Sequence, residues 1–273
     1  MDRVTQRAYA KLNLTLGVLY KRSDGYHALD SIMQSVDLFD TVTIERANDV
    51  LVTSTGMLLP FDNTVRRAAE KYRALTGRGA HVRVEKRIPA EAGMGGGSAD
   101  AAAVLNGMQA LYGEVDEPTL IELGAAVGAD VPFCMRGGLR RAEGIGEILT
   151  PLRGPKMNFV VVKPKQGVST KKLFSMLKLP RSMPDTTGCM RALADGDVPA
   201  AAALLFNALE EPAVGLVPEI GEIKRALLDA GALNACMTGS GSAVFGLFPD
   251  ESSAREASAK LTGYDFVRFC RST

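Results

Sequence analysis

A glycine-rich segment between a predicted strand and a predicted helix constrains this chain more than any other feature. Residues 89–100 read Pro-Ala-Glu-Ala-Gly-Met-Gly-Gly-Gly-Ser-Ala-Asp. Glycine adopts positive φ angles and leaves bare amides that a ligand can approach closely. A helix that opens at Ser98 adds free N–H groups and the positive end of its dipole. Together these features predict an anion cradle suited to a triphosphate.

Two common phosphate-binding motifs do not describe this segment. No Lys-Ser/Thr pair follows the glycines, which excludes a Walker A loop, and Ser98 replaces the third glycine of G-x-G-x-x-G. The alternative interpretation is a tight strand-to-helix turn with a serine cap. Residues 238–243 (Thr-Gly-Ser-Gly-Ser-Ala) would by themselves be read as a hairpin turn. Beside the first segment, they become a candidate second wall of a phosphate site.

Length and composition narrow the classes of protein to which the chain can belong. With 273 residues, 46% of them hydrophobic, it can fill one large or two modest domains. The net charge of +1 argues against a protein that tracks nucleic-acid phosphates. No apolar run approaches the ~18 residues of a membrane helix, and we expect no secretory signal. Four cysteines without a C-x-x-C pair, and only two histidines, argue against a disulfide framework or zinc site and favour a cytoplasmic location.

The hydrophobic pattern predicts a mixed chain of strands and helices. Leu12 and Leu14 alternate with Lys11 and Asn13, which predicts a half-buried strand with a polar face over residues 8–19. Further strands are predicted at 36–46, 82–84, 158–162, 233–238, 243–248 and 265–269. Helices are predicted from about 63 to 75 and at 98–111, 117–127, 170–178, 189–195, 198–207, 219–230 and 251–262.

A stretch with proline and glycine at residues 150–155 predicts a boundary between domains 1–152 and 153–273. After this boundary the predicted order is strand, helices, two strands, helix and strand. That order is typical of a ferredoxin-like split β-α-β unit.

The two glycine segments resemble motifs of the GHMP kinases, the superfamily of galactokinase, homoserine kinase, mevalonate kinase and phosphomevalonate kinase. Residues 89–101 resemble its ATP-binding signature, and residues 238–243 resemble its third motif. Met94 and Ala99 stand where the family often has Leu and Ser. Four further segments resemble the branch whose acceptor carries cytidine diphosphate: residues 10–14, 24–27, 128–132 and 143–147. The resemblance implies an α+β fold with a ribosomal-protein-like N-terminal domain and a ferredoxin-like C-terminal domain.

The resemblance also implies ATP and Mg²⁺ as cofactors. Ser98 is the expected protein ligand of Mg²⁺, and no acidic ligand is evident in the sequence. The implied ATP-binding residues are Pro89, Ala90, Glu91, Ala92, Gly93, Met94, Gly95, Gly96, Gly97, Ser98, Ala99, Asn63, Lys86, Gly239 and Ser240.

The resemblance assigns catalysis to Asp130 as general base and to Lys11 as its partner. An ammonium near Asp130 would keep the carboxylate ionised and lower the pKa of the acceptor hydroxyl. Without the resemblance, Asp130 would be read as a turn or helix-end residue and Lys11 as a solvated edge-strand lysine.

Residues 24–27 (Asp-Gly-Tyr-His) discriminate best between acceptors, because a pyrimidine stacks well on an aromatic ring. The resemblance implies that Tyr26 supplies this ring, that His27 hydrogen-bonds the base edge and that Phe174 closes the opposite side. Asn13 would bind the sugar or phosphate of the acceptor. The alternative interpretation is a hairpin aromatic over the core and a surface histidine.

The expected function is therefore ATP-dependent phosphorylation of the 2-hydroxyl of 4-diphosphocytidyl-2-C-methyl-D-erythritol, in the non-mevalonate route to isoprenoid precursors. The expected partners are small molecules only, without nucleic acid or membrane, and the expected state is a monomer or weak homodimer. Three alternatives remain open at this point: a homoserine or mevalonate kinase, a non-catalytic ATP sensor, and a ribosomal-type RNA-binding module.

Overall fold

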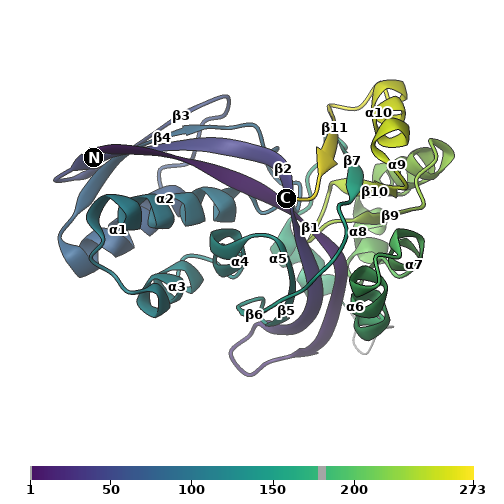
Figure 1. Ribbon diagram of the computed structural model, residues 1–273, viewed down its shortest axis with the longest axis horizontal. Coiled ribbons are helices and arrows are strands. Elements are labelled where there is room, and N and C mark those ends of the chain that lie inside the picture. The colour runs from purple at the N-terminus through teal and green to yellow at the C-terminus, as the bar shows by residue number, and fades with distance from the viewer. Residues whose placement is uncertain (1, 178–182) are drawn as a thin grey trace. The chain divides into compact units, whose positions relative to one another are not determined.

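A computed structural model describes residues 2–177 and 183–273 and divides the chain into two compact units (Figure 1). Unit 1 comprises Met1–Ala10, Leu38–Ile88 and Gly95–Gly137, and unit 2 comprises Lys11–Asp37, Pro89–Met94 and Gly138–Thr273. These bounds differ from the predicted domains, because the long strands β1 (Arg3–Lys21) and β2 (His27–Ala47) contribute residues to both units. Strand β5 (Leu139–Gly144) also pairs with the first half of β2, which adds residues before 153 to unit 2.

Unit 1 combines paired strands with four helices. The second half of β2 pairs antiparallel with β4 (Gly79–Glu85), which pairs parallel with β3 (Val50–Thr55). Helices α1 (Thr64–Thr76) and α2 (Gly96–Tyr112) lie side by side, and α3 (Glu117–Ala125) and α4 (Val131–Arg136) contact α2 (Figure 1). The predicted inner face of α2 is confirmed as buried: Ala101, Val104, Met108 and Leu111.

Unit 2 contains a four-stranded antiparallel sheet in the order β11-β7-β10-β9. Its strands are β7 (Asn158–Lys163), β9 (Asn234–Met237), β10 (Val244–Phe248) and β11 (Phe266–Arg271). Helices lie between β7 and β9, and one helix joins β10 to β11, so the predicted ferredoxin-like order is confirmed. The α+β fold class is confirmed in both units.

Helix α8 (Glu210–Leu216) was not predicted. The other helices of unit 2 follow the predicted order with shifted ends: α5 (Thr170–Met176), α6 (Thr186–Ala194), α7 (Val198–Ala203), α9 (Glu219–Asp229) and α10 (Glu251–Lys260). Residue 178, the end of one predicted helix, lies outside the described residues. Strand β8 (Phe206–Asn207) replaces the end of the predicted helix 198–207 and pairs parallel with β1, and β6 (Ile148–Pro151) pairs with β5. No described helix combines the length and apolar character needed to cross a bilayer.

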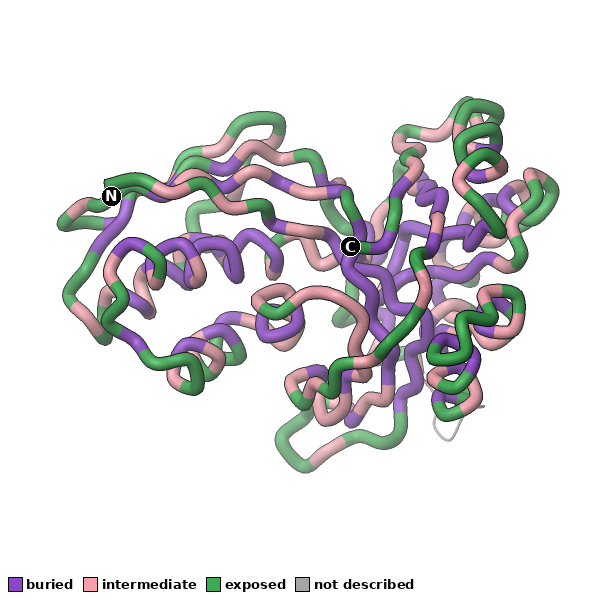
Figure 2. Tube along the Cα trace, viewed as in Figure 1, coloured by how far each residue is buried: buried purple, intermediate pink, exposed green. Residues whose placement is uncertain are grey.

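Strand β1 is buried on both faces over residues 10–18, so the prediction of a half-buried strand is wrong, although its polar face is present (Figure 2). Its polar side chains are satisfied by β2 instead of by water. Asn13 Nδ2 donates to Ser31 Oγ at 2.8 Å, and Ser31 Oγ donates to the Thr15 carbonyl oxygen at 2.6 Å. Because these hydrogen bonds satisfy the buried polar groups, the polar face of β1 can lie inside the protein.

Candidate active site

The two glycine-rich segments are hydrogen-bonded to each other within unit 2. The Ser242 amide donates to the Glu91 carbonyl oxygen at 3.1 Å. Thr238 Oγ1 donates to the Gly93 carbonyl oxygen at 3.3 Å. Residues 238–243 therefore lie beside the first segment, as a second wall of a phosphate site requires, and are more than an isolated hairpin turn.

Gly93 is the point of closest approach between the two segments. Its φ is +69°, and a Cβ atom there would lie 2.1 Å from the Thr238 carbonyl oxygen and 2.8 Å from the Gly241 nitrogen. A contact under 3 Å with backbone atoms cannot be relieved by turning a side chain. Only glycine therefore allows this approach.

We expect Gly93→Ala to weaken both nucleotide affinity and stability. Positive φ costs about 1 kcal/mol for alanine, and the overlap with Thr238 adds to that cost. Gly196→Ala is the matched control, because Gly196 has φ +75° with open space around it. Urea unfolding and the KM for ATP should separate the two variants. Equal loss in both would show that the approach of the segments contributes nothing.

The part of the first segment in unit 1 begins helix α2. Gly95 occupies the N-cap position with φ 71° and ψ 21°, so no side chain covers the first N–H groups of the helix. Thr64 Oγ1 donates to the Gly97 carbonyl oxygen at 2.6 Å and ties the start of α1 to the segment. Exposed amides at the start of a 17-residue helix are suited to bind an anion.

Gly128, two residues before Asp130, lies close to this helix start within unit 1. A Cβ atom on the nearby Gly128 would stand 3.8 Å from Ser98 Oγ. Asp130 precedes α4 in the N-cap position, is half-buried and makes no capping hydrogen bond to that helix. Asp130 thus lies in a turn at a helix end, as the alternative interpretation expects, and its role as general base stays a prediction.

Lys11 is buried among the glycine segments of unit 2, with 4% of its surface exposed. Its amide donates to the Met94 carbonyl oxygen at 3.0 Å, and Nζ donates to Asn13 Oδ1. A Cβ atom on Gly239 would lie 3.0 Å from Lys11 Nζ. The Asn13 amide donates to Thr238 Oγ1 at 3.1 Å. The interpretation of Lys11 as a solvated lysine is therefore wrong.

The turn at residues 22–26 presents Tyr26 to solvent. Asp24 Oδ1 accepts a hydrogen bond from the Tyr26 amide at 3.0 Å, and this bond is the main cause that lowers the pKa of Asp24. Gly25 adopts φ +87° at the tip. Tyr26 is 59% exposed, so it does not cover the core, contrary to the alternative interpretation.

His27 and Phe174 form an aromatic pair within unit 2. Their ring centroids are 4.9 Å apart with an interplanar angle of 30°. Burial, with a smaller effect of the Lys21 charge, lowers the pKa of His27, which favours the neutral ring at pH 7. The separation leaves no space for a third ring between the two, so the pair can only form one wall of a base site.

The second glycine segment is linked to the helix that carries Phe174. The hydroxyl groups of Ser240 and Thr170, the first residue of α5, are hydrogen-bonded at 2.7 Å.

Asn63, another predicted ATP residue, caps α1 through Oδ1, which accepts from the Arg66 amide at 2.9 Å. Apart from Lys86, the remaining predicted ATP residues lie in the two glycine-rich segments.

A buried ionic triad lies next to the glycine-rich segment in unit 1. Lys86 Nζ donates to Asp100 Oδ2 at 2.6 Å and also to Asp40 Oδ2, and the Lys86 side chain is 5% exposed. A Cβ atom on Gly96 would lie 3.5 Å from Lys86 Nζ. The triad joins β2, the residue after β4, and the fifth residue of α2. The Lys86 ammonium is thus engaged inside the protein, and contact between Lys86 and adenine stays a prediction.

The charges of the triad depend on one another. Burial raises the pKa of Asp100 to about 7, with a lowering effect of Lys86 and a further rise from Asp40. Burial lowers the pKa of Lys86, but the charges of Asp100 and Asp40 outweigh it and raise the pKa overall. Asp100 Oδ1 is buried and has no hydrogen-bond partner among the described residues. The single cation therefore stabilises two buried carboxyl groups.

The sequence analysis did not identify Asp40 or Asp100, although each is a carboxylate within or beside an apolar, inward-facing pattern. Asp40 interrupts the alternating buried residues of β2: Val36, Leu38, Val42 and Ile44. Asp100 directly precedes the apolar inner face of α2. A carboxylate on an inward face needs a buried partner, and Lys86 was available as one.

The surroundings of Ser98 suit a magnesium ion that keeps phosphate and water ligands. Within residues 2–177 and 183–273, no group of three or more His, Cys, Asp or Glu side chains could hold a metal. Mg²⁺ needs no such group, because it keeps several waters and binds beside phosphates through one or two protein oxygens. The half-buried Ser98 hydroxyl at the start of α2 is such an oxygen.

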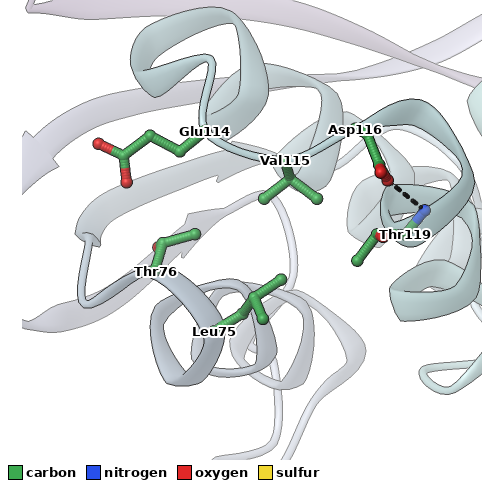
Figure 3. A pocket seen from close by; sticks show the side chains of 6 residues that line it. All are labelled: Leu75, Thr76, Glu114, Val115, Asp116 and Thr119. Atoms are coloured by element: carbon green, nitrogen blue, oxygen red, sulfur yellow. Dashed lines mark hydrogen bonds between the residues drawn. The ribbon is translucent and has the colours of Figure 1, made fainter.

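A hollow of about 450 Å³ in unit 1 does not belong to this site (Figure 3). It is lined by Leu75, Thr76, Glu114, Val115, Asp116 and Thr119. Asp116 caps α3 by accepting from the Thr119 amide at 2.9 Å. Residues 114–116 follow the C-terminal end of α2, and the glycine segment precedes its N-terminus. The two regions are therefore about 25 Å apart along the helix.

Two family models match the chain. The GHMP kinases N terminal domain matches residues 63–138, and the GHMP kinases C terminal model matches residues 189–265. The first range contains the glycine-rich segment and Asp130, and the second contains residues 238–243. Together with the fold, these matches define a GHMP kinase.

Named relatives of this chain identify one family within the GHMP kinases. The 4-diphosphocytidyl-2-C-methyl-D-erythritol kinase of Caldicellulosiruptor saccharolyticus is 42% identical, with 93% of this chain and 91% of the relative covered. The enzyme of the same name from Pelotomaculum thermopropionicum is 44% identical, with coverages of 96% and 95%. The chain belongs to the family of 4-diphosphocytidyl-2-C-methyl-D-erythritol kinases.

Solved structures agree with this family. A crystal structure of 4-(cytidine 5'-diphospho)-2C-methyl-D-erythritol kinase matches with a TM-score of 0.85 and 35% identity, covering 98% of this chain and 99% of the other. A homoserine kinase from Cytophaga hutchinsonii matches with a TM-score of 0.76 at 20% identity, covering 100% of this chain and 95% of the other. At that identity, the second likeness concerns the fold alone.

Proposed function

We propose that the protein transfers the γ-phosphate of ATP to the 2-hydroxyl of 4-diphosphocytidyl-2-C-methyl-D-erythritol, in the non-mevalonate route to isoprenoid precursors. The observation that carries the proposal is the pair of hydrogen-bonded glycine segments with the buried Lys11 against them. The names of the relatives supply the acceptor. The amides of both segments and the start of α2 bind the phosphates.

Asp130 accepts the proton of the attacking hydroxyl as phosphoryl transfer proceeds. Lys11 lowers the pKa of that hydroxyl through its charge. Ser98 would hold a Mg²⁺ ion together with phosphate oxygens, and the ion supplies neutralisation of the phosphate charge. A non-catalytic ATP sensor would have lost Lys11 or Asp130, and both residues are present in the sequence.

The acceptor is recognised through its cytosine and its sugar alcohol. Tyr26 stacks on the base, neutral His27 hydrogen-bonds the base edge, and Phe174 encloses the base from the opposite side. Asn13 binds the sugar or phosphate of the acceptor. A homoserine or mevalonate kinase has no need for these aromatic residues.

A turnover assay with ATP tests the proposal directly. The cytidylylated acceptor should be phosphorylated, and the uncytidylylated alcohols, homoserine and mevalonate should react about 5- to 150-fold more slowly, because base stacking contributes ~1–3 kcal/mol. Equal turnover of mevalonate or homoserine would contradict the acceptor. RNA binding that persists at raised salt would favour the ribosomal-type alternative.

We expect Phe174→Ala to raise the KM for the cytidylylated acceptor about tenfold or more, with the KM for ATP little changed. Phe269→Ala is the matched control, because both rings are partly buried against the same core of unit 2. Steady-state kinetics with each substrate varied in turn separates the variants. A similar change in both KM values for Phe174→Ala would indicate general loss of structure instead of lost base contact.

A further inference from the structure

Asn207 is a buried amide at the end of strand β8, and all of its polar groups are engaged. Its Nδ2 donates to the carbonyl oxygens of Met237 at 2.7 Å and Gly239 at 2.8 Å. Its Oδ1 accepts from the Leu209 amide at 2.9 Å. Only 8% of the residue is exposed. A buried amide with every group bonded holds its partners in one arrangement.

The bond to Gly239 determines how the second glycine segment is oriented. A trans peptide is planar, so its C=O and N–H groups point in opposite directions. Because the Gly239 carbonyl points at Asn207, the Ser240 amide points away from Asn207. No described residue accepts a backbone hydrogen bond from that amide. It is therefore available to a ligand.

Glu210 completes the support of this segment. Strand β9 lies at the edge of the sheet, so the outward groups of Met237 have no neighbouring strand to bond. Glu210 Oε2 accepts from the Met237 amide at 2.7 Å, and Asn207 takes the Met237 carbonyl. The Lys224 ammonium pairs with the other oxygen of Glu210. Side chains from the β8–α8 turn thus replace the missing strand just before the glycine segment.

We propose that Asn207 is a positioning residue for the nucleotide: it holds the Gly239 carbonyl so that the Ser240 amide faces a phosphate oxygen of ATP. The inference rests on the proposed function, in which residues 238–243 form one wall of the phosphate site. Asn207 acts through the backbone and does not itself contact ATP. Loss of its two N–H donors should weaken ATP binding specifically.

Asn207→Asp tests this role, because it keeps the size of the side chain and places oxygen against two carbonyl oxygens. We expect the KM for ATP to rise about tenfold or more, and the KM for the cytidylylated acceptor to change less than about threefold. Asn234→Asp is the matched control. Asn234 is the first residue of β9, and its Nδ2 donates to the Ala202 carbonyl oxygen at 2.8 Å, away from the glycine segment. Both KM values should stay near normal in that variant.

Asn207→Ala provides a second variant, without a buried charge, in case Asn207→Asp does not fold. Calorimetric titration with a non-hydrolysable ATP analogue should then show the same loss of affinity. Normal ATP affinity in a folded Asn207→Ala protein, or equal shifts of both KM values, would overturn the inference. If the wild-type protein binds the analogue but does not phosphorylate the cytidylylated acceptor, the proposed acceptor is wrong. The role of Asn207 can still be measured in that case, because it is tested by binding of the analogue. Absence of nucleotide binding to the wild-type protein would overturn both.

Discussion

Asp130→Asn should lower kcat by about 100-fold or more and leave the KM for ATP close to that of the wild-type protein. Asparagine has nearly the same shape as aspartate but cannot accept the hydroxyl proton, and general-base groups contribute ~10²–10⁴ in rate. The carboxylate makes no capping hydrogen bond to α4, so the substitution should not disturb the helix. Steady-state kinetics and binding of an ATP analogue measure the two quantities separately.

Asp116→Asn is the control for Asp130→Asn. Asp116 also precedes a helix of unit 1, and its Oδ1 accepts a hydrogen bond that asparagine can accept as well. The kcat of the Asp116→Asn protein should equal that of the wild-type protein. If Lys11 and Asp130 act on the same proton, Lys11→Met should add little further loss to Asp130→Asn. Turnover near normal in Asp130→Asn would remove Asp130 from the mechanism.

Lys86→Met should lower the free energy of unfolding by about 3–5 kcal/mol, because it leaves two buried carboxyl groups without their cation. The Asp40 and Asp100 side chains are 0% and 1% exposed, so water cannot replace the ammonium. At ~2–4 °C per kcal/mol, the midpoint of thermal unfolding should fall by about 6–20 °C. Scanning calorimetry and urea unfolding provide the measurements.

Adding Asp100→Asn to Lys86→Met should recover part of the loss, since a neutral amide removes one of the two stranded carboxyl groups. Lys71→Met is the charge-matched control on helix α1 and should change stability by less than about 0.5 kcal/mol. The triad would be unimportant if Lys86→Met and Lys71→Met were equally stable.

Local hydrophobic patterns predicted those helices and strands whose buried face can be recognised within a single stretch of sequence. Helix α1 begins after Asn63 because that side chain caps it, and the apolar spacing of α2 marks its buried face. The strand and helix order of unit 2 followed from the same periodicity. Strands β3, β5 and β6 and helices α4 and α8 were not predicted, because they are short or lack clear periodicity. Strand β5 forms by pairing with β2, a segment more than 100 residues earlier.

The residues of the candidate site also fall into those that local sequence motifs identified and those that only the structure revealed. The two glycine segments, Lys11, Asp130 and the aromatic residues were recognisable from local motifs. Their buried neighbours Asp40 and Asp100 were not, although both pair with Lys86, which the resemblance placed among the ATP-binding residues. These two residues lie 46 and 14 positions from Lys86, so local spacing could mark each carboxylate as inward-facing but could not show that it pairs with Lys86.

By itself, the sequence determined the family, the phosphate-binding character of residues 89–100 and the amphipathic helices, because glycine conformation and hydrophobic periodicity act over a few neighbouring residues. Only the tertiary structure decided that β1 buries its polar face, that Gly93 contacts the Thr238 backbone and that Asn207 orients the second segment. These features depend on which distant groups satisfy each buried donor and acceptor. That pairing is settled when the whole chain packs.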